Sequence, residues 1–219
     1  MSLEDEVNNK GSKKFIKKAL KLGWKLGMAA ATTALSTAFV GMNGVLIGGA
    51  FALSGGIANL AKGKSLYDTV SEGLTAYSAV NAIMQPMVAL GNATFPLIAN
   101  DTVAGWMARG LYASTVYNAA FLGTYRAAGH LLDNYLNPKG ITKTVSEGFA
   151  KDWFRIGLLF SPFYFLDANG ITKLNVLGYT LPTFAVGALP VGFLFNYFNK
   201  DKAKQASSYM PQYSTAPAH

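Results

Sequence analysis

The chain has 219 residues, of which 51% are apolar and 14% are charged, and its net charge is +8. A soluble domain carries about 25% charged residues, so this composition favours a membrane protein over a soluble enzyme. Because cysteine is absent and His130 and His219 are the only histidines, disulfides, thiolate sites and multi-histidine metal sites are excluded, and we expect no metal, cofactor or catalytic activity.

Residues 1–26 form a basic segment with an amphipathic pattern. Phe15, Ile16 and Leu20 fall on one helical face and the lysines fall on the other. The segment can lie at the membrane interface and bind anionic lipid, or it can begin the first membrane helix with snorkelling lysines. No nucleic acid is expected, because no base-reading motif accompanies the lysines. These are Lys10, Lys13, Lys14, Lys17, Lys18, Lys21 and Lys25.

Residues 27–199 are predicted to form a transmembrane bundle. The stretch 27–61 contains no ionisable residue, whereas a single membrane helix needs about 20 apolar residues. Turn residues at Gly41 and Asn43 would let this stretch fold back and cross twice. Further apolar segments lie at about 71–90, 103–136, 154–166 and 174–198. We therefore expect an all-α, polytopic transmembrane bundle of five or six helices, followed by a disordered polar tail at 200–219.

The chain also contains an internal repeat. The pentapeptide Thr-Val-Ser-Glu-Gly at 69–73 recurs at 144–148, and a gap-free alignment also matches Asn59 with Asn134. This predicts tandem helical hairpins at about 43–93 and 118–166, with a partial third copy at about 174–199.

The repeated pentapeptide has the pattern of a helix capping box. Its first and fourth residues are a threonine and a glutamate, which can each satisfy one backbone N–H at the start of a helix. We therefore predict that Thr69 with Glu72, and Thr144 with Glu147, are helix N-caps, with a functional carboxylate as the alternative.

The positions of the basic residues predict the orientation of the bundle. Lysines occur in the loops at 62–68 and 137–147 and in the C-terminal tail, and these segments are predicted to be cytoplasmic. The loop at 91–102 has no Lys or Arg and carries glycosylation sequons at Asn92 and Asn100, so it is predicted to be external. The N-terminal lysines join the cytoplasmic side only if the stretch 27–61 turns back.

The candidate functional residues are polar groups inside predicted membrane segments. Arg126, His130 and Asp133 share one helical face, and Asn134 follows them. Charged residues in a membrane are functional candidates, although an ion pair at the membrane surface would also explain them, as it would Asp152 with Arg155. The repeated Asn59, Asn134 and Asn196 are predicted to cap helices, to bond between helices or to line a pore.

Two functions agree with these features. The repeat and the charged set favour a channel or transport module for small solutes or ions. The alternative is a non-catalytic structural or assembly subunit of a membrane complex or a virion membrane. A ladder of small residues, Gly44, Gly48, Ala52 and Gly56, predicts close helix packing within the bundle or in a homo-oligomer.

Overall fold

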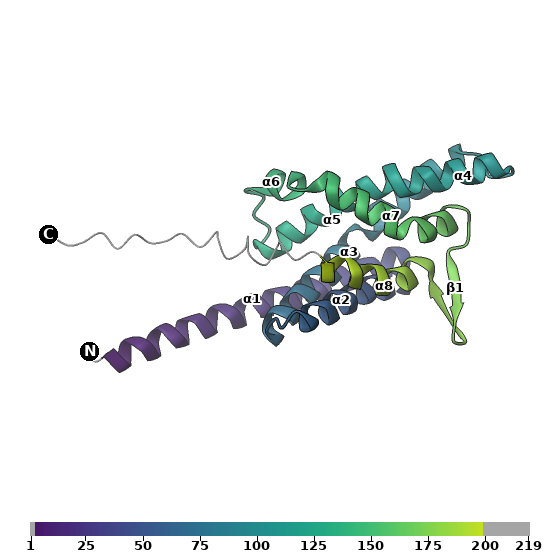
Figure 1. Cartoon of the computed structure of the whole chain (residues 1–219). Helices are drawn as coiled ribbons and strands as arrows, with labels where there is room; N and C mark the ends of the chain where they lie inside the picture. Colours follow the sequence, from purple (N-terminus) through teal and green to yellow (C-terminus); the bar gives the residue numbers. More distant parts are fainter. Residues whose placement is uncertain (1–2, 199–219) are drawn as a thin grey trace.

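The computed structural model describes residues 3–198, so the predicted tail at 200–219 lies outside the described residues. The described chain is helical apart from one short hairpin, which confirms the all-α class (Figure 1). Its elements are α1 (Leu3–Val40), α2 (Met42–Ala61), α3 (Leu66–Thr94), the 3₁₀ turn η1 (Phe95–Leu97), α4 (Val103–Tyr112), the π-helical turn η2 (Ala113–Tyr117), α5 (Asn118–Asp133), α6 (Ile141–Ser146), α7 (Phe149–Ala168), β1 (Lys173–Val176), β2 (Tyr179–Pro182) and α8 (Thr183–Phe198).

The uncharged stretch folds back at Gly41, as the turn residues predict. Gly41 has φ +63°, a conformation that glycine adopts without the steric cost paid by other residues, and it separates α1 from α2. Gly44 then packs directly against Ser36, so α2 returns along α1 in the antiparallel direction (Figure 1). The stretch 27–61 therefore belongs to two helices.

The connections fall into two groups at opposite ends of the bundle (Figure 1). The α2–α3 turn and the α5–α6 loop lie at the end from which the N-terminal half of α1 projects, and we call this the basic end. There the Trp24 indole donates a 2.9 Å hydrogen bond to the carbonyl of Leu132. At the other end, called the hairpin end, Asn169 donates to the carbonyl of Trp106 at 3.2 Å. The lysine-bearing loops thus share one end of the molecule.

The predicted apolar helix at 174–198 is wrong in its first part. Residues 173–182 form the antiparallel β1–β2 hairpin, which turns at Leu177 and Gly178 with φ values of 52° and 84°. Two successive positive φ values are typical of a type I′ turn, which matches the twist of paired strands. Helix α8 begins only at Thr183, whose hydroxyl is buried and donates to the carbonyl of Ile171 at 2.6 Å.

The small-residue ladder packs within the chain. A Cβ added at Gly48 would lie 2.6 Å from Asn81 Nδ2, and one added at Gly44 would overlap the Ser36 hydroxyl. The absence of a side chain at these positions therefore lets α2 approach both α3 and α1 closely. The small residues therefore account for close packing within the chain, and a role for them in a homo-oligomer stays a prediction.

Among the described helices, α2 alone is long and apolar enough, by length and composition, to cross a membrane. The apolar part of α8, Thr183–Tyr197, is shorter. Helices α3 and α7 are long enough, but α3 carries acidic residues and many small polar residues, and α7 carries four charged residues, among them Asp152. One such helix is compatible with a membrane protein, and the predicted bundle of five or six crossings remains a proposal.

Candidate functional site

Arg126, His130 and Asp133 occupy one face of α5 but contact three different parts of the molecule. Arg126 contacts α7 and the C-terminal end of α6, His130 contacts α6 and the loop before it, and Asp133 contacts α1 and α3. These side chains therefore do not form one cluster, and a functional role for them stays a prediction. The three residues share a face but lie at different heights along α5, spread over about 10 Å at 1.5 Å per residue, so their side chains reach different neighbouring elements.

Arg126 stabilises the break between α6 and α7. Its guanidinium donates to the carbonyls of Val145 at 2.9 Å and Glu147 at 2.8 Å, and it forms an ion pair with Asp152. The Arg126 and Asp152 side chains are only 9% and 6% exposed. Because the helix is interrupted here, those carbonyls lack an intrahelical N–H, and the planar guanidinium supplies the missing donors. Arg126 is therefore a structural residue in this fold.

The predicted cap at Thr69 lies inside a helix. Helix α3 begins one turn earlier, and its N-cap is Ser65, whose hydroxyl accepts from the Asp68 amide at 3.1 Å. The buried Thr69 hydroxyl has no hydrogen-bond partner among the described residues. Glu72, predicted to reach back to the cap, instead accepts from Asn59 and Lys64, each at 2.8 Å. Ser65 rather than Thr69 is the N-cap because a cap at Ser65 lets the helix begin one turn earlier, which makes it longer.

The second copy of the pentapeptide has a different backbone. Thr144 lies within α6 and its hydroxyl contacts His130 Nδ1 at 2.9 Å, while Glu147 ends that helix. Gly148, with φ +61°, is the N-cap of α7. The capping prediction is therefore wrong for Thr144 and Glu147 too. In the first copy of the repeat, Phe51 aligns with Arg126 and cannot donate a hydrogen bond to free carbonyls. The pentapeptide at 69–73 stays helical within α3.

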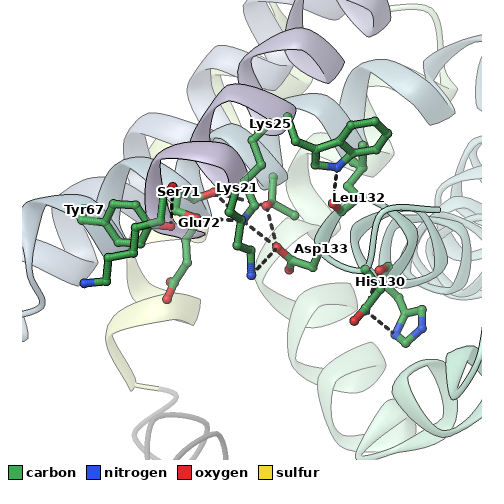
Figure 2. A network of polar contacts seen from close by, with 12 residues as sticks. Lys21, Lys25, Tyr67, Ser71, Glu72, His130, Leu132 and Asp133 are labelled. Atoms are coloured by element: carbon green, nitrogen blue, oxygen red, sulfur yellow. Dashed lines mark hydrogen bonds and ion pairs between the residues drawn. The ribbon is translucent and has the colours of Figure 1, made fainter. Parts of the chain in front are cut away.

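A polar network joins α1, α3 and α5 at the basic end (Figure 2). The Lys25 ammonium is only 3% exposed and lies 2.5 Å from Asp133 Oδ1. It also donates to the carbonyl and the hydroxyl of Ser71 at 3.0 and 2.9 Å. Thr75 donates to the same Asp133 oxygen at 3.1 Å. In the sequence, Lys25 differs from the other N-terminal lysines by its place next to the uncharged stretch 27–61.

A cavity of about 160 Å³ opens beside this network, and we call it the vestibule. Helices α2, α3, α5 and α8 line it, and its polar groups are Asn59, Glu72, Thr75, Asp133 and Asn196. Two of the three repeated asparagines are therefore brought together. Asn134 is separate from them and donates instead to the carbonyl of His130 at 2.8 Å.

Lys62 lies at the rim of the vestibule, where its ammonium donates to the carbonyl of Asn196. Partial burial, and to a smaller degree the neighbouring charge of Lys64, lower the pKa of the Lys62 amine, while Glu72 opposes the shift. The rim therefore places amines and carboxylates side by side, and the vestibule has mixed charge.

Phe51 separates the vestibule from two inner cavities. It lines the vestibule, a second cavity of about 190 Å³ that contains Arg126 and Asp152, and a third of about 40 Å³. The Phe51 ring stacks on Phe160 at 6.0 Å and also contacts Phe121 at 6.0 Å. The third cavity is aromatic and apolar, so the interior changes from polar to apolar along the axis of the bundle.

Three buried polar side chains at the aromatic cavity have hydrogen-bond partners. Tyr164 donates to Asn118 Oδ1 at 2.9 Å, and Asn118, which is completely buried, donates to the carbonyl of Trp153 at 3.0 Å. Tyr117 donates to the carbonyl of Met87 at 3.1 Å. These bonds satisfy groups that would otherwise be costly to bury.

The described residues contain no cluster of three or more histidines and acids that could hold a metal ion. Comparison with protein-family models, with curated proteins and with solved structures found no match for this chain.

Proposed function

We propose that the chain is a membrane-embedded helical bundle that passes small solutes or ions through its interior. The observation that carries this proposal is the row of cavities that meet at Phe51, polar at the basic end and aromatic further in. An apolar constriction behind a polar vestibule can act as a gate, because water leaves a narrow apolar passage readily. The packing of the Phe121 and Phe160 rings against Phe51 supports assigning the constriction to this position.

The outer surface supports the membrane part of the proposal. Large apolar side chains are exposed on several helices, whereas soluble monomers rarely expose wide apolar areas. A bundle surrounded by lipid would keep them out of water, with the polar groups turned inward. Examples are Phe39 on α1, Leu53 on α2, Leu111 on α4, and Phe154 and Leu158 on α7.

Flux across vesicle membranes tests the proposal. The protein is reconstituted into liposomes, and stopped-flow light scattering follows glycerol entry while a trapped dye follows K⁺ entry. We expect Phe51→Ala to raise the flux of at least one probe tenfold or more above wild type, because it removes the wall shared by the three cavities.

Leu53→Ala is the matched control, since Leu53 is two residues away on α2 and 56% exposed on its outer surface. It should leave the flux at the wild-type rate. Rates equal to those of empty liposomes for both probes, with wild type and with Phe51→Ala, would refute the proposal.

The same exposed apolar side chains also support the second candidate, a non-catalytic assembly subunit. In that case a partner protein, rather than lipid, would cover the outer surface of the helices. Phe154→Ala with Leu158→Ala would then break a larger complex in mild detergent, as measured by light scattering, and the flux of Phe51→Ala would equal that of empty liposomes.

A further inference from the structure

The N-terminal half of α1 projects from the basic end beyond the other helices (Figure 1). We call residues 12–22 of this helix the arm. Lys18 lies 4.6 Å above the ring of Tyr67, and Lys21 lies 4.0 Å from Asp133, so these lysines face the bundle. The other side of the arm faces outward.

The outward side of the arm is apolar. Phe15 is 73% exposed, Leu20 is 67% exposed and Ile16 is 51% exposed. At about 100° per residue, these residues and Ala19 fall within an arc of about 140°. The lysines of the arm and its flanks fall within the opposite arc, so the two kinds of side chain are separated around the helix.

We propose that the arm binds an anionic lipid bilayer, with Phe15, Ile16 and Leu20 inserted among the headgroups and the lysines beside the lipid phosphates. Charge complementarity identifies the occupant, because the arm and its flanks carry seven lysines between residues 10 and 25 and no acidic residue in that range. An apolar face beside a lysine face is the pattern of helices that lie in the membrane interface. Each lysine near such a surface contributes about fivefold in affinity.

The geometry of α1 permits this docking. Trp24 and Lys25 fix the helix to the bundle, and Gly23 immediately precedes them with nothing within 4 Å of its open side. Glycine is a weak point in a helix, and kinks occur at such residues. A bend away from the bundle at Gly23 turns the outward apolar face toward the membrane from which the bundle emerges. Among the contacts of the described residues, it breaks the exposed ones that Lys18 and Lys21 make with the bundle.

The chain has no cysteine, so a single introduced cysteine reports on one position. Leu20→Cys places an environment-sensitive dye on the apolar face, and Lys17→Cys places it on the lysine face as the matched control. Each labelled full-length protein is reconstituted as one copy per nanodisc, in neutral phosphatidylcholine or with about one third phosphatidylglycerol.

We expect the Leu20→Cys dye to shift its emission to the blue and to be quenched by nitroxide lipids in the anionic discs only, and we expect 1 M salt to reverse both effects. The Lys17→Cys dye should stay in water. Adding Lys13→Gln, Lys14→Gln and Lys18→Gln should weaken docking about a hundredfold, and Gly23→Ala should weaken it by stiffening the helix.

Identical spectra in neutral and anionic discs would overturn the proposal. So would a shift that requires two copies per disc, which would assign the apolar face to self-association, or a shift with a DNA duplex but not with anionic lipid. The proposal rests on the membrane-embedded bundle of the proposed function but not on solute flux, because Phe51→Ala leaves the arm intact and the arm variants leave the cavities intact.

Discussion

The buried ammonium of Lys25 on α1 is paired with the carboxylate of Asp133 on α5, and the two partners differ in their contact with water. The Lys25 side chain is 3% exposed, whereas that of Asp133 is 43% exposed. Removing one partner is therefore not equivalent to removing the other, because a charge left unpaired costs more when it is buried.

We expect Asp133→Asn to destabilise the protein by about 2 kcal/mol, since it leaves the buried ammonium of Lys25 with neutral acceptors and without an opposite charge. Lys25→Met should cost less than about 1 kcal/mol, because Asp133 stays hydrated and lies near Lys21. Thermal unfolding in detergent measures both variants. Equal losses would show that the asymmetry of exposure does not govern this pair.

Arg126 should be irreplaceable by lysine. Arg126→Lys keeps the charge, but a single ammonium cannot donate to Val145, Glu147 and Asp152 together in the geometry of a guanidinium. We expect a loss of about 2 kcal/mol and faster amide hydrogen exchange around Gly148. Arg155→Lys on α7 is the comparison, and a loss as large as that of Arg126→Lys would contradict the role assigned to the guanidinium.

Gly148 and Gly73 occupy equivalent positions in the two pentapeptides, but replacing each by alanine should change the stability of the protein in opposite directions. Gly148→Ala places a side chain at φ +61°, where the left-handed backbone costs about 1 kcal/mol, so the melting temperature should fall. Gly73→Ala sits in a regular helix with its new Cβ 3.8 Å from the carbonyl of Ala52, so we expect it to stabilise by up to about 1 kcal/mol. A fall of similar size in both variants would mean that the two pentapeptides share one backbone.

Single cysteines should also test which side of the membrane each end faces. In sealed proteoliposomes, a membrane-impermeant maleimide should label Leu66→Cys and Lys139→Cys, both at the basic end, to the same extent. Leu97 and Leu177 are strongly exposed at the hairpin end. The maleimide should label Leu97→Cys and Leu177→Cys from the opposite side of the membrane. Labelling of all four positions from one side would rule out a bundle that crosses the membrane end to end.

Sequence patterns predicted the features that depend on local chemistry. Gly41 was identified as a turn because glycine adopts positive φ at little cost, and the structure confirms the fold-back there. The lysines of the α2–α3 and α5–α6 connections were expected on one side, and they do lie at one end of the bundle (Figure 1). The hairpin at 173–182 was missed, because a short apolar run before Pro182 looks the same whether it is a strand or a helix.

The sequence by itself determined a helical chain with a basic end, a turn at Gly41 and a repeated pentapeptide, since composition, charge and glycine act within a few residues. Tertiary structure decided which partner each polar side chain has. Asp133 pairs with Lys25, and Arg126 pairs with Asp152. Phe51 lines three cavities. Tertiary structure also decided that the two identical pentapeptides have different backbone conformations. The carbonyls of a broken helix can be satisfied by a guanidinium only where the fold brings one close, as it brings Arg126 to Val145 and Glu147.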